Sequence, residues 1–264
     1  MRAAIVIPAR YASTRYPAKP LALLRGAGGA AKPLIQRSWE AAMAVPGVDH
    51  VLVATDDARI AEVATGFGAR VAMTPEGCAN GTERCAAALD QLPGDVGIVV
   101  NLQGDAPLTP PAMVSALIDR LRQGTAQVAT PALACAPDLY RRLVADQREG
   151  RVGGTTVVIA RSGDALYFSK RVIPYVPDER ADEPGLPVFL HVGVYGYTRA
   201  ALTAYAALPV SQLEMLEGLE QLRFLDAGLP VAMVEQPAGQ ELWELNNPSD
   251  VPVIEAMLAS RGMD

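Results

Sequence analysis

The chain has few cysteines and histidines, no excess of basic residues and no long hydrophobic run, and each shortage excludes a class of protein. Its 264 residues include three cysteines (Cys78, Cys85 and Cys135), with neither metal-ligand spacing nor an even number for disulfides. The net charge of −6 argues against a general nucleic-acid binder. Apolar runs are broken by charges or proline, and the first residues lack the layout of a signal peptide. We therefore expect a cytoplasmic chain in a reducing compartment, with neither nucleic acid nor membrane as a partner.

The apolar residues that are present predict an α/β fold. In the first half, buried-strand runs alternate with helical periodicity, which is typical of a doubly wound, parallel sheet. The strands are expected at 3–7, 51–54 and 97–102, and the helices at 34–44, 58–65, 82–92 and 111–123. After residue 125 strands predominate, at 128–134, 155–160, 166–169 and 189–197, and helices return at 198–207, 211–226 and 249–260. We predict one domain over 1–264 with a mixed, mainly parallel sheet, an inserted antiparallel lobe at 150–190 and a surface loop at 176–188.

The segment from Pro8 to Pro20 follows the first strand and holds three cations in ten residues, Arg10, Arg15 and Lys19. Cations this close repel one another, so a loop that collects them is expected to bind a polyanion. Open α/β sheets bind ligands at the carboxyl ends of their strands, and arginine and lysine suit phosphate groups. The small hydroxyl residues Ser13 and Thr14 lie between the cations. We interpret the loop as a phosphate site; the alternative is a solvated basic loop.

Two further segments carry polar groups at places where ligands bind. Asp105 follows the apolar strand at 97–102 and has the geometry expected of a Mg²⁺ ligand, the alternative being an aspartate that forms a turn before proline. The segment Asn80–Arg84 opens a helix, whose first N–H groups suit a nucleobase or a phosphate; an ordinary N-cap is equally compatible. By contrast, the glycines at 26–29 lack the position of a dinucleotide-binding fingerprint, so we interpret them as a turn.

Polar residues near the C-terminal part of the chain form a second candidate group. Strand alternation from 189 to 197 places His191 and Tyr195 on one face, and a core histidine is the alternative to a ligand-binding one. Glu214, Glu217 and Gln221 are expected to share one face of the helix at 211–226. A solvated acidic face is the default interpretation of that helix.

These segments together resemble the 3-deoxy-manno-octulosonate cytidylyltransferases (CMP-KDO synthetases), which are glycosyltransferase-A-like nucleotidyltransferases. The similarity follows family order from residue 3 to about residue 250. It is carried by Ile7–Arg15 with Pro17 and Lys19-Pro20, Val53–Asp56, Gly81–Arg84, Asn101 with Gln103–Asp105, Ala165–Ser169, His191 with Gly193 and Tyr195–Tyr197, and Leu216–Arg223 without Gly218.

The resemblance implies an enzyme that transfers CMP from CTP to an acidic acceptor, releases pyrophosphate, uses Mg²⁺ and forms a homodimer through the antiparallel extension. Lys19, Arg15 and Asp105 would be catalytic. The implied CTP-binding residues are Ala9, Arg10, Ser13, Thr14, Arg15, Lys19, Thr55, Asn80, Gly81, Thr82, Arg84 and Gln103. The implied acceptor-binding residues are Gln103, His191, Tyr195, Glu220 and Gln221, and the implied metal ligands are Asp105 and Asn246.

The chain departs from the family pattern at positions that concern the metal and the acceptor. Ala106 and Asn246 stand where the family has carboxylates, and Leu190 replaces an arginine. A weaker metal site suits an acceptor that is already ionised, because a sugar hydroxyl needs more activation. We therefore expect a phosphonate acceptor such as phosphonoformate, in natural-product biosynthesis. The alternatives are 3-deoxy-manno-octulosonate, for lipopolysaccharide, and a CTP-binding pseudoenzyme without activity.

Overall fold

The computed structural model describes residues 1–12, 16–237 and 242–264 and divides the chain into two compact units. The first unit comprises 1–118 and 241–264, and the second comprises 119–240. Because the second unit interrupts the first, the first is assembled from both ends of the sequence.

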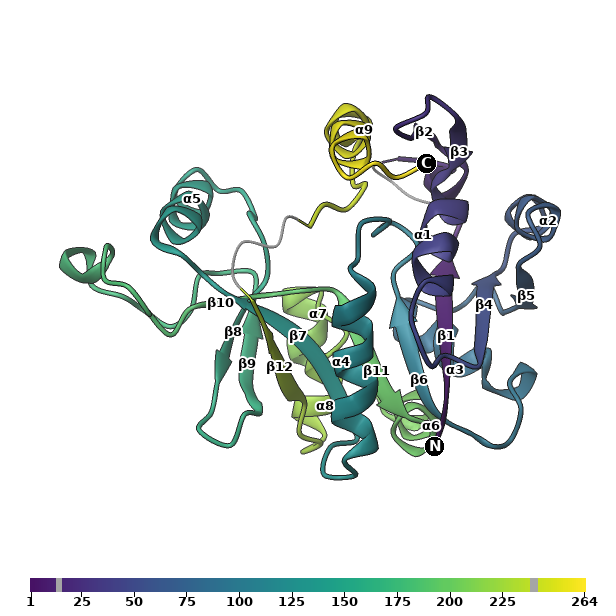
Figure 1. The fold of residues 1–264 in the computed structure, drawn as a ribbon. Helices are drawn as coiled ribbons and strands as arrows, with labels where there is room; N and C mark the ends of the chain where they lie inside the picture. Colours follow the sequence, from purple (N-terminus) through teal and green to yellow (C-terminus); the bar gives the residue numbers. More distant parts are fainter. Residues whose placement is uncertain (13–15, 238–241) are drawn as a thin grey trace. The chain divides into compact units, whose positions relative to one another are not determined.

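The first unit is built on parallel strands in the order β5–β4–β1–β6 (Figure 1). These strands are β1 (Arg2–Ala9), β4 (His50–Thr55), β5 (Arg70–Met73) and β6 (Val96–Leu102). Residues 3–7 of β1 are completely buried, as a strand covered on both faces requires. In this register Val6 pairs with Leu52 on one side and with Asn101 on the other, so the carboxyl ends of β1 and β6 lie at the same edge.

The helices of this unit are α1 (Leu34–Met43), α2 (Ala58–Gly66), α3 (Gly81–Ala87) and α9 (Val251–Ser260). α4 (Pro111–Arg122) begins here and continues into the second unit. In Figure 1, α1 lies in front of β1 and α3 behind it, as expected for a doubly wound sheet. Short 3₁₀ turns occupy Lys19–Leu21, Leu89–Gln91 and Pro248–Asp250.

The C-terminal helix packs on the first unit through a small apolar cluster. Leu24, Leu34 and Leu108 contact Leu245, Ile254 and Leu258, all of them at most 2% exposed. The hairpin of β2 (Leu23–Arg25) and β3 (Ala31–Pro33) supplies Leu24, and its turn contains the glycines at 26–29. The prediction that these glycines form a turn is therefore confirmed.

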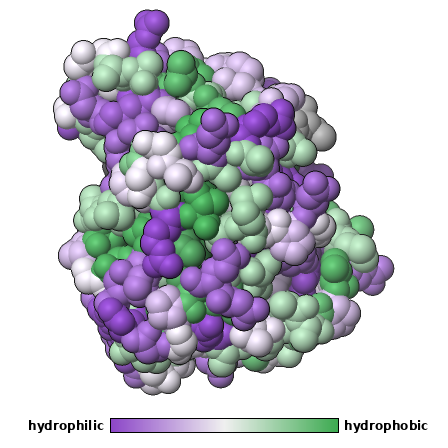
Figure 2. Space-filling view, turned by 90° about the vertical axis from the view of Figure 1, so that its right-hand side faces the viewer, coloured by the Kyte–Doolittle hydropathy of each residue, from purple (hydrophilic) through white to green (hydrophobic). Residues whose placement is uncertain are grey.

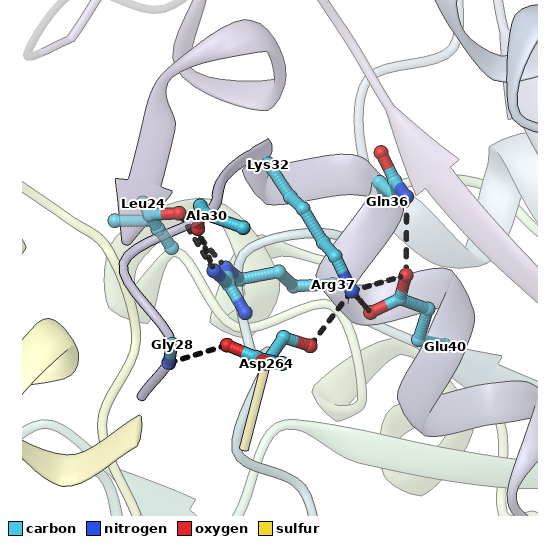
Figure 3. A network of polar contacts seen from close by, with 8 residues as sticks. All are labelled: Leu24, Gly28, Ala30, Lys32, Gln36, Arg37, Glu40 and Asp264. Atoms are coloured by element: carbon cyan, nitrogen blue, oxygen red, sulfur yellow. Dashed lines mark hydrogen bonds and ion pairs between the residues drawn. The ribbon is translucent and has the colours of Figure 1, made fainter. Parts of the chain in front are cut away.

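Polar contacts hold the last residue against the same hairpin (Figure 3). The Gly28 N–H donates to Asp264 Oδ1 at 2.5 Å, and Lys32 Nζ donates to the Asp264 carbonyl at 2.7 Å and to Glu40 Oε1 at 3.0 Å. Arg37 is buried and donates to the Leu24 carbonyl. The terminal segment is thus joined to the N-terminal part of the chain by charge-assisted hydrogen bonds.

The second unit has mostly antiparallel strands in the order β11–β7–β10–β8–β9, with β12 pairing in parallel with β7. The strands are β7 (Val128–Ala134), β8 (Thr156–Ile159), β9 (Ala165–Ser169), β10 (Phe189–His191), β11 (Val194–Thr198) and β12 (Ala232–Gln236). The helices are α5 (Pro137–Arg148), α6 (Arg199–Ala207), α7 (Gln212–Glu217) and α8 (Leu222–Asp226), and a 3₁₀ turn covers Asp178–Arg180. The predicted α/β class with a mixed, mainly parallel sheet is confirmed.

Some sequence predictions need correction. The predicted helix at 211–226 is two helices, because Gly218 takes the left-handed conformation with φ +60° and ends α7. The predicted strand at 189–197 is interrupted after His191 and resumes at Val194. Sequence reasoning also missed α5, although Tyr140 and Leu143 occupy one apolar face of it and are buried.

Within the described ranges, no helix combines the length and the apolarity that crossing a bilayer requires. On the face drawn in Figure 2, hydrophobic residues are interspersed with hydrophilic ones.

Candidate functional site

The loop after β1 carries the predicted phosphate-binding residues. Ala9 is the buried last residue of β1, and Arg10 is exposed. The predictions for Ser13, Thr14 and Arg15 lie outside the described residues. The loop is held by a hydrogen bond from the Ala18 N–H to the Tyr11 carbonyl, 3.0 Å long. Ala18 has φ +56°, a left-handed conformation that is unfavourable for alanine and that places the backbone strain directly before Lys19.

Lys19 and Asp105 form an ion pair at the carboxyl edge of β1 and β6. The distance from Lys19 Nζ to Asp105 Oδ2 is 2.5 Å, and the two side chains are 16% and 22% exposed. A partly exposed pair of this kind remains accessible to a ligand. When the pair separates, Lys19 can bind a phosphate and Asp105 can bind a cation. The structure thus brings together two of the three predicted catalytic residues.

The segment before α9 reaches the same aspartate. The Leu245 N–H donates to the Asp105 carbonyl at 2.9 Å, which makes Asn246 a near neighbour of Asp105. The Asn246 N–H itself donates to Asp250 Oδ2 at 2.8 Å, so its backbone is fixed. Residues far apart in the sequence therefore meet where the resemblance predicts the metal.

The donor set in this place fits a magnesium ion. Asp105 supplies a carboxylate and Asn246 an amide oxygen, and Mg²⁺ usually takes one or two protein oxygens and completes its shell with phosphates and water. Among the described residues, no group of three or more histidines, cysteines or acids could hold a metal by itself. A metal here would therefore depend on the nucleotide for several of its ligands.

The turn that opens α3 lies on the same unit. Asn80 caps the helix by accepting a hydrogen bond from the Glu83 N–H at 2.8 Å, and Thr82 is buried. Gly81 is required at the first position: a Cβ there would lie 2.9 Å from Gln103 Nε2 and 3.1 Å from Asn101 Nδ2. The backbone of the turn therefore lies directly against the side-chain amides of Asn101, in β6, and of Gln103, just after it.

Arg84 supports this turn from within the unit. Its guanidinium is 3% exposed, donates to Thr74 Oγ1 at 2.6 Å and pairs with Asp56 at 3.0 Å. The buried Thr55 ends β4 and accepts a hydrogen bond from the Asp57 N–H. These contacts position the turn, and the predicted roles of Thr55 and Arg84 in CTP binding remain predictions.

Asn101 is a polar residue whose position sequence reasoning did not interpret. It is completely buried in β6, and neither its Oδ1 nor its Nδ2 has a hydrogen-bond partner among the residues that the structure describes. An unsatisfied buried amide costs about 1–3 kcal/mol. The sequence signal that could have found it is one asparagine within the apolar run from Val96 to Leu102.

The second unit brings together the predicted acceptor residues His191, Tyr195 and Gln221. The rings of His191 and Tyr195 are 5.4 Å apart, and Tyr195 OH donates to Gln221 Oε1 at 3.1 Å. Gln221 is buried, and among the described residues its Nε2 has no partner. Glu220 lies beside Gln221 and accepts a hydrogen bond from Tyr205 OH at its carbonyl.

His191 is a neutral imidazole at pH 7. The ring is partly buried beside the Phe168 and Tyr195 rings, and the resulting desolvation lowers the pKa of His191 to about 3. Its Nε2 lies 2.8 Å from Thr130 Oγ1, and that hydroxyl also lies 2.8 Å from the Val194 carbonyl. Because the hydroxyl has one hydrogen and gives it to the carbonyl, it accepts the Nε2–H of His191 and leaves Nδ1 as an acceptor.

The acidic residues of α7 do not form a solvated face. Glu214 is buried and paired with Arg223, with distances of 2.6 Å to Nε and 2.7 Å to Nη2. Glu217 accepts hydrogen bonds from Ser169 Oγ at 2.7 Å and from the Lys170 N–H at 3.0 Å. The interpretation as a solvated acidic face is therefore wrong, because both carboxylates are used to fix α7 to neighbouring elements.

Comparisons with known proteins show the class of protein to which this chain belongs. A family model described as cytidylyltransferase matches residues 4–233. The chain belongs to this cytidylyltransferase family, and it is an enzyme of the nucleotidyltransferase class. A solved 4-diphosphocytidyl-2C-methyl-D-erythritol synthase from Anaerococcus prevotii shares the fold, with a TM-score of 0.59 at 12% identity.

Closer relatives have a more specific name. The 3-deoxy-manno-octulosonate cytidylyltransferase of Maricaulis maris is 44% identical over 97% of each chain, and that of Zea mays is 38% identical over 99% of this chain and 83% of its own. A solved CMP:2-keto-3-deoxy-manno-octonic acid synthetase, in complex with CTP, superposes with a TM-score of 0.85 at 33% identity over 99% of this chain and 100% of its own. The resemblance predicted from the sequence is confirmed.

Proposed function

We propose that this chain transfers CMP from CTP to 3-deoxy-manno-octulosonate and releases pyrophosphate. The observation that carries the proposal is the similarity, over nearly the whole chain, to relatives named for this reaction. It favours the sugar acid over the phosphonate that the departures at Ala106 and Asn246 led us to expect.

In this reaction a hydroxyl oxygen of the acceptor attacks the α-phosphorus of CTP, the bond to the β-phosphate breaks, and the hydroxyl proton is lost. Catalysis depends mainly on positioning and on neutralising charge. Arg10 and Lys19 supply cations for the triphosphate, and the turn at Asn80–Thr82 supplies backbone groups for the base. A bound Mg²⁺, held by Asp105 and Asn246, would supply further charge neutralisation.

The residues of the second unit are proposed to hold the acceptor. Gln221 Nε2 offers a buried N–H donor suited to a carboxylate, and Tyr195 orients this amide by donating to its oxygen. His191 adds the uncharged acceptor Nδ1, which suits a sugar hydroxyl. Such a polyol acid needs both kinds of partner, whereas a small phosphonate offers fewer hydroxyl groups to recognise.

The test is pyrophosphate release with CTP, Mg²⁺ and a panel of acids. The panel contains 3-deoxy-manno-octulosonate, its 8-amino-3,8-dideoxy analogue and phosphonoformate, because a relative from Shewanella sediminis at 36% identity is named for the amino sugar. We expect turnover with the octulosonate. Turnover with phosphonoformate alone would favour the phosphonate, and CTP binding without turnover of any acid would favour a pseudoenzyme.

We also propose that the chain forms a homodimer through the lobe at 150–190 and the adjoining helix α7. Leu166 of β9 and Leu216 of α7 are 63% and 78% exposed, and the hydrogen bond between Ser169 and Glu217 connects these two elements. Exposed apolar side chains on connected elements are typical of an interface. Light scattering should give the mass of a dimer, and Leu166→Lys with Leu216→Lys should give that of a monomer.

A further inference from the structure

Asn101 is a buried polar side chain that the folded protein does not need for its own packing. The remaining residues of β6 are apolar or glycine, and the strand is central in the first unit. Within the part of the chain that the structure describes, neither amide atom of Asn101 has a partner. A leucine or valine would pack in this strand without that penalty, so the asparagine is unfavourable to the fold itself.

The amide of Asn101 faces the first residue of α3. Its Nδ2 lies 3.1 Å from the position that a Cβ of Gly81 would occupy. Gln103 follows directly after β6, and its Nε2 lies 2.9 Å from the same position. Gly81 is partly exposed and has no side chain. Because Gly81 has no side chain, the space beside the Asn101 and Gln103 amides is not filled by this residue, at the partly exposed turn where the nucleotide is proposed to bind.

We propose that Asn101 is a nucleoside-recognition residue, which forms its missing hydrogen bonds with the polar edge of the pyrimidine when CTP binds against the Gly81 turn. This inference rests on the proposed function and adds a residue to its CTP site. An amide presents a donor and an acceptor side by side, and so does the edge of cytosine that carries its amino group and N3. Gln103, closer to the surface, is the neighbouring amide.

If Asn101 serves nucleotide binding and not folding, its replacement should weaken CTP binding without lowering the stability of the free protein. In Asn101→Leu, the nearly isosteric side chain removes an unsatisfied amide, so the melting temperature of the free protein should be unchanged or higher. The affinity for CTP should fall about tenfold or more, as expected for lost hydrogen bonds to the base. The affinity for inorganic tripolyphosphate should stay within twofold of wild type, because the cations that bind phosphate are intact.

Thr156→Val provides a matched control. Thr156 is as buried as Asn101 but fully paired: it donates to the Arg171 carbonyl at 2.6 Å and accepts from the Ile173 N–H at 3.1 Å. This variant should lower the melting temperature and leave the affinity for CTP unchanged. Asn101→Leu is therefore expected to weaken CTP binding without lowering the melting temperature, and Thr156→Val to lower the melting temperature without weakening CTP binding.

The experiment is calorimetric titration of each variant with CTP and with tripolyphosphate, together with thermal unfolding of the free protein. Asn101→Val is the second variant. An unchanged CTP affinity in Asn101→Leu, or unfolding of both Asn101 variants, would overturn the proposal and make Asn101 a structural residue. If the wild-type protein binds tripolyphosphate but not CTP, the proposed function itself fails, and this outcome is distinguishable from the others.

Discussion

Breaking the buried ion pair between Glu214 and Arg223 should destabilise the second unit more than most single substitutions would. Arg223 makes two parallel hydrogen bonds to the Glu214 carboxylate, and its guanidinium lies 4.2 Å from the centre of the Tyr205 ring. The two side chains are 4% and 10% exposed, so solvent screens them little. We predict that Arg223→Met strongly destabilises the protein.

The magnitude follows from the charge that the substitution leaves behind. Removing Arg223 leaves the Glu214 carboxylate buried, with Tyr205 OH at 3.5 Å as a weak neighbour. Removing one partner of a buried pair costs about 3–5 kcal/mol, whereas replacing both with apolar residues is often close to neutral. For a chain of this size, that cost lowers the melting temperature by roughly 6–20 °C. The double variant Glu214→Leu with Arg223→Met should recover most of the loss.

Urea unfolding followed by circular dichroism measures this cycle of single and double variants. The same variants report on function, because Tyr205 also holds the Glu220 carbonyl and Gln221 is the next residue. Arg223→Met should therefore raise the KM for the acceptor more than the KM for CTP. A loss below about 1 kcal/mol for Arg223→Met would refute the reasoning, because it would mean that solvent reaches the carboxylate.

Three further predictions concern the candidate sites. Gly81→Ala should raise the KM for CTP roughly tenfold, because the new Cβ would lie 2.9 Å from Gln103 Nε2. The control Gly77→Ala should leave that KM unchanged, because a Cβ on Gly77 would meet no atom within 4 Å. Asn246→Asp should tighten Mg²⁺ binding roughly tenfold, because it adds a carboxylate, and the shift of melting temperature with Mg²⁺ in the absence of substrates measures this. Between pH 7.5 and pH 5 the wild-type protein should lose about 2 kcal/mol of stability because of His191, and the variant His191→Gln should not show this loss. Urea unfolding at each pH measures the difference.

The sign of the His191 prediction follows from its pKa. The folded-state pKa of His191 is lowered to about 3, so below about pH 6.5 the unfolded chain binds a proton that the folded chain does not. The stability from this residue is therefore present above pH 6.5 and is lost as the pH falls towards 3. Equal pH dependence in wild type and variant would show that the ring is protonated in the folded state. An unchanged KM for CTP in Gly81→Ala would contradict the close approach of the turn to Gln103. Unchanged Mg²⁺ binding in Asn246→Asp would contradict the assignment of Asn246 as a metal ligand.

The positions of the loop after β1 and of Asp105 after β6 could be predicted from the sequence, because apolar runs indicate where strands end and parallel strands share a carboxyl edge. The Lys19–Asp105 pair is a consequence of that rule. The meeting of Leu245 with Asp105 could not be predicted from local pattern, because it depends on how α9 packs on the hairpin at Leu24. Only the family resemblance suggested it.

Helix boundaries in the second unit were harder to predict, for two different reasons. Gly218 interrupts a run of helix-forming residues, and no local rule distinguishes a glycine tolerated within a helix from one that ends it. The carboxylate of Glu214 looked solvated because its partner Arg223 lies in the next helix. The burial of a charge depends on tertiary pairing, and the spacing of charges along one helix does not reveal it.

The insertion of the second unit into the first has a consequence for the order of folding during synthesis. All of residues 119–240 are synthesised before Leu245, Ile254 and Leu258, and these three complete the cluster around Leu24 and Leu34. Domains tend to fold as units as they emerge. The first unit therefore exposes the apolar surface around Leu24 and Leu34 until α9 is available to cover it, whereas the second unit is continuous in the sequence and does not depend on that helix for its own chain.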